Sequence, residues 1–258
     1  MAGTQTGPSR TNVRVLDGLR LAVTTLTVLP LRAGRIDRSA AAVAMTVAPA
    51  VGVLLGLVLA GLLEGLRAAG SPALVSAAVT VAAGALLTRG LHLDGLADTV
   101  DAFGSYRTGP AALEIMKKPD IGPFGVAALA VTVLTQAAAI TEVGPWALVT
   151  AWATGRLALT IACRRGVPAA RPDGLGAMVA STVPLGAVLV AATAVAALAA
   201  TAVPGRPWQG PAAVAGALFA VVLLLRHAVR RFGGLTGDVL GAAVETATTV
   251  TLVALTLG

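Results

Sequence analysis

Long apolar segments separated by short polar connections make up most of the chain. Seven of them are about 20 residues long, the length that a helix needs to cross about 30 Å of hydrocarbon. None alternates polar and apolar residues as the strands of a membrane barrel do. The pattern therefore predicts an all-α, polytopic membrane bundle of about seven spanning helices. These segments lie at 40–63, 71–88, 122–141, 145–162, 178–202, 208–225 and 239–257.

The N-terminal region has a different pattern. Residues 1–13 are polar, and we expect them to form a disordered tail. Residues 14–31 carry Asp17 and Arg20 ahead of about eleven uncharged residues, which is short for a membrane crossing. We therefore expect an interfacial or partly inserted helix here, at the start of one membrane-embedded domain that covers residues 14–258.

The composition supports a membrane protein. The chain is 56% hydrophobic and 12% charged, and its mean hydropathy is +0.85. Soluble domains carry roughly a quarter charged residues. Thirty glycines among many alanines favour helices that pack closely through small side chains. The single cysteine, Cys163, excludes an intrachain disulfide and a thiolate cluster.

The net charge of +7 follows the predicted topology. Alternate connections carry nearly all the basic residues between the apolar segments, whereas the connections on the other side carry only Arg67 and Arg206. By the positive-inside rule, the basic connections and the N-terminus face the cytoplasm. Topology thus explains the charge, and we expect no nucleic-acid partner. The basic set is Arg32, Arg35, Arg38, Arg89, Arg107, Lys117, Lys118, Arg164, Arg165, Arg171, Arg226, Arg230 and Arg231.

The stretch RGLHLDGLADTVDAFG, residues 89–104, is the strongest chemical signal. Asp94, Asp98 and Asp101 are spaced i, i+4, i+7 and share one face of a helix. Three carboxylates in a row repel one another unless a cation joins them, and Mg²⁺ prefers oxygen ligands. We therefore predict a magnesium site at these three residues, with a solvated helix end as the alternative. His92 is either an orienting histidine or a direct substrate contact.

The longest predicted cytoplasmic connection runs from Tyr106 to Gly125. Pro110 suits the first turn of a short helix, on which Glu114 and Lys118 are expected to form an i, i+4 pair. We expect this helix to stop at Pro119.

Several other charged residues near the predicted cytoplasmic face are candidate substrate ligands. Arg156 lies inside an apolar segment, where a positive charge is either functional or snorkels to the membrane surface. Arg164 and Arg171 flank a glycine-rich loop that could hold an anion. Lys117 contacts a phosphate or serves only as a topology anchor, and Asp120 is held in a tight turn before the next segment.

Two acids mark the last apolar segment. Asp238 follows a run of glycines at the start of the segment, where the helix dipole alone would favour an acid. Glu245 lies seven residues further on the same face, too deep for that explanation, and it needs a partner or a polar cavity. We therefore predict that these two acids form a second half of the site.

Six segments of this chain, taken in order, resemble the cobalamin synthase family of integral membrane adenosylcobinamide-GDP ribazoletransferases. The resemblance covers most of residues 21–248, and the HLDGLAD and GGLTGDVLGA stretches are its most specific parts. The chain departs from the family pattern at Lys118, where we would expect an aspartate, so an acidic ligand is not expected there. The segments are LTVLPLR, APAVGVLLG, LHLDGLADTVDAFGS, ALEIMKKPDIGPFG, ARPDGLGA and FGGLTGDVLGAAVE.

The resemblance implies a Mg²⁺-dependent reaction at the cytoplasmic face of a bacterial cell membrane. A ribosyl hydroxyl of α-ribazole or its 5′-phosphate attacks the phosphoryl group nearer the cobinamide in adenosylcobinamide-GDP, and GMP leaves. The product is adenosylcobalamin or its 5′-phosphate.

Such a displacement needs cationic charge on the phosphoryl oxygens and a base for the hydroxyl. We assign Asp94, Asp98 and Asp101 to metal binding, and one of them, with Asp101 favoured, is the alternative base. Asp238 would complete the metal site or bind the ribazole. Phosphate contacts are expected from Lys117, Arg156, Arg164 and Arg171.

Two other functions remain open at this point, and so does a homo-oligomeric state. A CDP-alcohol phosphotransferase of lipid synthesis also uses aspartate-rich helices, but its pattern has an alanine-arginine pair and further spaced aspartates that this stretch lacks. A cation-coupled transporter would use Asp98 and Glu245 as ion ligands. It would move its substrate without chemical turnover.

Overall fold

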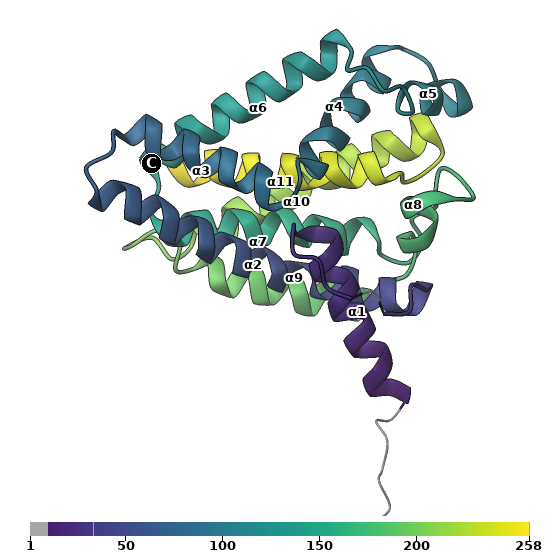
Figure 1. Ribbon diagram of the computed structural model, residues 1–258, viewed down its shortest axis with the longest axis horizontal. Helices are drawn as coiled ribbons and strands as arrows, with labels where there is room; N and C mark the ends of the chain where they lie inside the picture. Colours follow the sequence, from purple (N-terminus) through teal and green to yellow (C-terminus); the bar gives the residue numbers. More distant parts are fainter. Residues whose placement is uncertain (1–9, 33, 258) are drawn as a thin grey trace, which may run out of the picture.

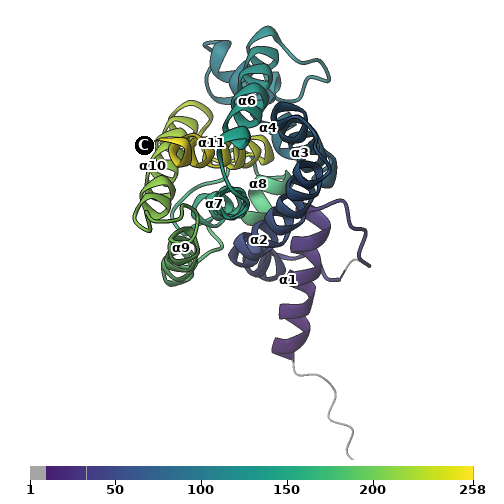
Figure 2. The same ribbon diagram turned by 90° about the vertical axis from the view of Figure 1, so that its left-hand side faces the viewer.

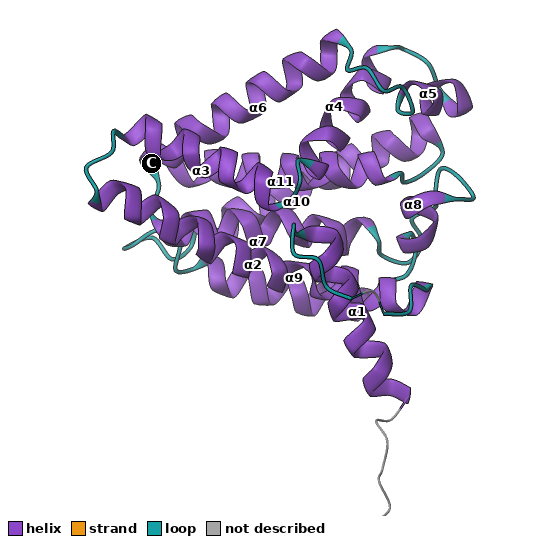
Figure 3. Cartoon of the chain, in the orientation of Figure 1, coloured by secondary structure: helices purple, strands orange, loops and turns teal. Residues whose placement is uncertain are grey.

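The computed structural model describes residues 10–32 and 34–257, which form eleven α-helices and no strand (Figures 1 and 3). Two isolated β-bridges, Arg164 with Val183 and Ala169 with Leu235, are the only extended pairings within these residues. The prediction of an all-α fold is confirmed. The helices are α1 (Arg10–Leu26), α2 (Arg38–Ala68), α3 (Ala73–Leu87), α4 (Leu91–Gly104), α5 (Gly109–Ile115), α6 (Pro123–Glu142), α7 (Pro145–Ala162), α8 (Gly174–Val179), α9 (Leu185–Ala199), α10 (Gln209–Phe232) and α11 (Gly237–Thr256).

Each of the seven predicted membrane segments contains a helix, but not every helix is long or apolar enough to cross a bilayer alone. Within the described residues, the helices long and apolar enough are α2, α6, α10 and α11. The helices α3 and α4 form a pair bent by 90° that could count as a fifth span. The helix α9 has only 15 residues, or about 22 Å. It starts late because Thr182 and Val183 donate their amide hydrogens to the carbonyl of Cys163, both at 3.0 Å. The chain is a multi-pass membrane protein, and the count of seven crossings stays a prediction.

The helix α7 is the centre of the bundle, where it contacts α2, α9, α10 and α11 (Figure 2). From Ala147 to Ala162 every residue of α7 except Trp152 is buried. Close packing depends on glycines of α2, since a Cβ atom at Gly56 would lie 2.8 Å from the Cα of Val149. Because protein surrounds α7, this helix can carry the buried Arg156 that a lipid-facing helix would not tolerate.

Side chains at the helix starts fix where the main helices begin. Asp37 accepts the amide hydrogens of Ser39 and Ala40, both at 2.9 Å, and the Ala40 contact is the main cause of a lowered pKa at Asp37. The hydroxyl of Thr236 accepts the amide hydrogen of Val239 at 3.1 Å and so begins α11. This start places Asp238 in the first turn of α11, as the sequence predicted.

The connections predicted to be cytoplasmic gather at one end of the bundle, at the right of Figure 1 beside α5 and α8. Three arginines tie them together by donating Nη2 hydrogens to carbonyl oxygens: Arg38 to Ala180 at 2.7 Å, Arg171 to Leu113 at 2.6 Å and Arg231 to Arg107 at 2.8 Å. The sequence partition into a basic and a nearly neutral side thus corresponds to two ends of the molecule.

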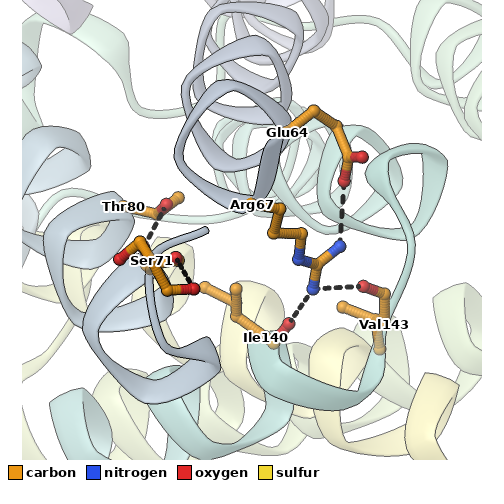
Figure 4. A network of polar contacts seen from close by, with 7 residues as sticks. Glu64, Arg67, Ser71, Thr80, Ile140 and Val143 are labelled. Atoms are coloured by element: carbon orange, nitrogen blue, oxygen red, sulfur yellow. Dashed lines mark hydrogen bonds and ion pairs between the residues drawn. The ribbon is translucent and has the colours of Figure 1, made fainter. Parts of the chain in front are cut away.

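The opposite end is held by Arg67 (Figure 4). Its guanidinium pairs with Glu64 at 2.9 Å and donates to the carbonyl oxygens of Ile140 and Val143, at 3.0 and 3.2 Å. These bonds fasten the end of α2 to the turn between α6 and α7. Ser71, just before α3, and Thr80, in the middle of α3, are drawn beside this network.

The N-terminal helix α1 begins at Arg10, earlier than the residue 14 that the sequence suggested; residues 1–9 lie outside the described residues. It packs against α2, and its first turns project from the bundle (Figures 1 and 2). Its last turn is tied to the bend between α3 and α4, because Arg89 donates to the carbonyl of Thr24 at 3.0 Å. Its interfacial placement stays a prediction.

Candidate active site

A close crossing of α4 and α11 brings two distant sequence segments together. A Cβ atom at Gly95 would lie 2.7 Å from the carbonyl oxygen of Asp238, and one at Gly241 would lie 3.0 Å from that of His92. Only glycine allows the two backbones to approach this far. The crossing places Asp238 beside the acidic face of α4, as the sequence analysis proposed.

The acids at this crossing fall into two groups. The Asp98 carboxylate is half-buried and is repelled by the charges of Asp238, Asp94 and Asp101. Within residues 10–32 and 34–257, the side chains of Asp94 and Asp98 have no hydrogen-bond or ion-pair partner. These two carboxylates are therefore free to bind a ligand.

The Asp101 carboxylate differs in having hydrogen-bond donors, although Asp101 shares a helix face with Asp94 and Asp98. It is 9% exposed, and its two oxygens accept the amide hydrogens of Gly122 at 2.7 Å and Gly125 at 2.8 Å. Asp101 thus caps the N-terminus of α6 from a neighbouring helix. Both oxygens already accept hydrogen bonds, so this carboxylate is less available to a ligand than that of Asp98.

The acids fit a shared metal site better than a closed protein cage. In the described part of the chain, no group of three or more Asp, Glu, His or Cys side chains lies close enough together to hold a metal ion alone. Mg²⁺ commonly takes only one or two carboxylates and completes its shell with water and substrate phosphates. The mutually repelling carboxylates of Asp94, Asp98 and Asp238 suit that arrangement, and metal binding stays a prediction.

A first cavity of about 330 Å³ lies between α4 and the connection from α5 to α6. Asp98, Asp101 and Asp120 line it together with Lys118. Lys118 therefore brings an exposed cation to the cavity that Asp98 also lines, at the position where the family pattern suggests an acid.

The predicted pairing within α5 is wrong. Glu114 pairs with Lys117 at 2.8 Å, and not with Lys118. The helix ends at Ile115, well before Pro119, so Lys118 is not on a continuous helix with Glu114. The hydrogen bond from Lys117 is the main cause of a lowered pKa at Glu114. Lys117 does not line the first cavity, whereas Lys118 does.

A second cavity, of about 220 Å³, has one polar and one apolar side. His92, Asp94 and Asp238 form the polar side. The apolar wall comes from six helices and consists of Leu26, Met45, Leu91, Leu159, Leu175 and Leu240. His92 is 4% exposed, so it belongs to the floor of this cavity.

A third cavity, of about 230 Å³, joins the loop before α8 to the start of α11. Arg171, Asp173 and Asp238 line it. Arg171 attracts the Asp238 carboxylate, and its Nε atom is buried without a hydrogen-bond partner. Asp238 faces both this cavity and the second one, so it lies at the junction between them.

Four predicted ligands lie outside these cavities: Lys117, which pairs with Glu114, and Arg156, Arg164 and Glu245. Arg156 is 2% exposed, stacks 4.1 Å above the ring of Trp152 and, with Glu245, lines an enclosed space of about 20 Å³. Glu245 accepts a hydrogen bond from Gln136 at 2.8 Å and is attracted by Arg156, which confirms that it needed a buried partner. A common ion path would require Asp98 and Glu245 to line one cavity, but they line two different ones. Arg164 faces a fourth cavity beside α10.

Sequence reasoning missed the apolar wall of the second cavity. Leu26 and Met45 reach it from α1 and α2, and Leu175 reaches it from α8. Single apolar residues within apolar segments carry no chemical signal, and their role depends on contacts between distant helices. The family-like stretches LTVLPLR and APAVGVLLG, close to these positions, were the available hint.

The comparisons with known proteins agree with these features. A family model described as "Cobalamin-5-phosphate synthase" matches residues 18–256. Proteins named adenosylcobinamide-GDP ribazoletransferase from Frankia casuarinae and a Nocardioides species are each 41% identical to this chain, over 92% of its length and 94% and 97% of theirs. A protein of the same name from Bradyrhizobium diazoefficiens is 35% identical over 92% of both chains. No solved structure matches the chain. The chain therefore belongs to the cobalamin-5-phosphate synthase family.

Proposed function

We propose that the chain is an adenosylcobinamide-GDP ribazoletransferase. The observation that carries this proposal is that Asp94, Asp98 and Asp238 each line at least one of three cavities, in a chain whose relatives carry that name. In the reaction, a ribosyl hydroxyl of α-ribazole or its 5′-phosphate forms a bond to the phosphorus nearer the cobinamide. The bond from that phosphorus to the GMP oxygen breaks. GMP leaves, and the hydroxyl proton passes to a base.

Each carboxylate has a distinct role in this proposal. Asp94 and Asp238 line the second cavity together, and they would hold a Mg²⁺ ion that supplies positive charge to the phosphoryl oxygens. Asp98 accepts the hydroxyl proton, because it is half-buried and has no hydrogen-bond donor of its own. Asp101 positions the first turn of α6 and is not the base, in contrast to the expectation from the sequence alone.

The cavities suggest where the substrate groups bind. The apolar wall of the second cavity fits the flat base of a ribazole, with the ribose toward Asp94 and Asp238. Lys118 in the first cavity and Arg171 in the third lie on either side of the acids and can contact the two phosphates of the other substrate. A corrin ring exceeds about 220 Å³, so it stays outside the second cavity. The positive-inside pattern supports a site that faces the cytoplasm.

The test is a direct assay on the purified protein in lipid. We expect adenosylcobinamide-GDP and α-ribazole to yield GMP and one corrinoid product in equal amounts when Mg²⁺ is present, and none when it is chelated. The CDP-alcohol alternative predicts turnover with CDP-alcohols instead, and the transporter alternative predicts uptake into vesicles without GMP. Absence of GMP under conditions in which one of the named relatives is active would refute the proposal.

A further inference from the structure

The fourth cavity, of about 320 Å³, lies between the end of α7 and the last turns of α10. Arg164, Arg226 and Arg230 line it together with the apolar side chains of Val167, Leu225 and Val229. It shares no lining residue with the three cavities around α4. The proposed reaction therefore makes no use of it.

The positive charge in this cavity is not compensated by the protein. Ion pairs within the described ranges involve Asp17, Glu64 and Glu114, and none includes an arginine of the fourth cavity. Arg226 and Arg230 lie one turn apart on α10 and are both exposed, while Arg164 donates one hydrogen to the carbonyl of Ile161 at 3.1 Å. Three guanidinium groups without a carboxylate form a site for an anion.

An apolar stripe continues from these arginines along the same helix. Phe219 and Leu223, seven and three residues before Arg226, lie on the same face of α10 and are 66% and 47% exposed. This helix is one of those long and apolar enough to cross a membrane. An inorganic anion or a nucleotide would satisfy the arginines but would leave the stripe uncovered. A molecule with a phosphate at one end and a long apolar tail satisfies both.

We propose that the fourth cavity binds the headgroup of an anionic phospholipid, whose acyl chain lies along Phe219 and Leu223. Basic pockets at the ends of membrane helices bind anionic lipid headgroups for the same physical reason, since the guanidinium groups meet the phosphate at the depth of the headgroup layer. The bound lipid would fix α10 against the end of α7. It would do so at a distance from the acids of α4 and α11.

Native mass spectrometry of the full-length protein, exchanged from detergent into mixed micelles, tests the proposal. Dioleoylphosphatidylglycerol and dioleoylphosphatidylcholine serve as the anionic and the neutral probe. We expect the protein to retain one phosphatidylglycerol molecule that phosphatidylcholine does not replace. The Arg226→Gln and Arg230→Gln variants should each bind it about fivefold more weakly, and the double variant more than tenfold. Both side chains are exposed, so the variants should keep the wild-type unfolding temperature without lipid.

The matched control is Arg107→Gln, an exposed arginine at the same end of the bundle that does not line the fourth cavity. It should bind phosphatidylglycerol as the wild type does. Equal retention of the two lipids, or undiminished retention by the double variant, would overturn the proposal. One further outcome would overturn the proposal: pyrophosphate raises the unfolding temperature of the wild type but not of the double variant, and phosphatidylglycerol has no effect. That result would show a site for a soluble anion.

Discussion

Two charged regions of this bundle differ in how their charges are balanced. In the core, the charge of Glu245 is offset by Arg156 and by a hydrogen bond from Gln136, around a space of only about 20 Å³. At the crossing of α4 and α11, Asp94 and Asp98 have no such partner and line cavities of 220 and 330 Å³. The protein itself balances the charge of the first region, whereas the second leaves room for a ligand. In the proposed function, acids that look alike in the sequence therefore serve stability in one place and chemistry in the other.

The largest expected effect comes from breaking the balanced region. Replacing Glu245 by Ala removes the carboxylate that attracts the buried Arg156 and leaves the amide of Gln136 without this acceptor, which should lower the free energy of unfolding by about 2–3 kcal/mol. Unfolding in detergent, followed by circular dichroism, measures this change. Glu142→Ala removes an exposed acid at the end of α6 and serves as the control, with an expected change below about 0.5 kcal/mol. Equal stability of the two variants would show that the core pair is not structural.

Removing a carboxylate from the unbalanced region should lower activity and leave stability intact. Asp98→Asn keeps the volume and removes the carboxylate, so turnover should fall at least about 100-fold, which corresponds to the loss of a general base. The unfolding temperature should stay the same or rise, because the repulsion from Asp94 and Asp238 is removed. GMP release at saturating substrate gives the rate. A variant with wild-type turnover would exclude Asp98 as the base.

The smallest expected change in stability is at Asp101, and it tests to which of the two regions this residue belongs. Asp101 belongs to the acidic face by sequence but to the balanced region by its contacts. Asp101→Ala should lower the free energy of unfolding by about 1–2 kcal/mol through the lost cap on α6. Its Mg²⁺ requirement should not change, and any loss of turnover should follow the loss of folded protein. A raised Mg²⁺ requirement at full stability would instead make Asp101 a metal ligand.

Much of this arrangement could be predicted from the sequence, because helix periodicity and the positive-inside rule are local signals. They gave the seven helical segments, the basic end of the bundle and the pairing of Asp238 with α4. The sequence could not distinguish Asp98 from Asp101, because the amides that satisfy Asp101 come from residues more than twenty positions away. The end of α5 before Lys118 and the apolar wall from α1 and α2 depend on tertiary contacts in the same way.

The central claim is that α4 and α11 build one site, in which Asp94 and Asp238 hold the same cation. A double-mutant cycle tests it most directly: the Mg²⁺ concentration at half-maximal GMP release is measured for the wild type, Asp94→Asn, Asp238→Asn and the double variant. If both carboxylates bind one ion, each single change raises that concentration about tenfold or more, and the double variant departs from the product of the two effects. Single effects that multiply without coupling, or no change in any variant, would contradict a shared cation site.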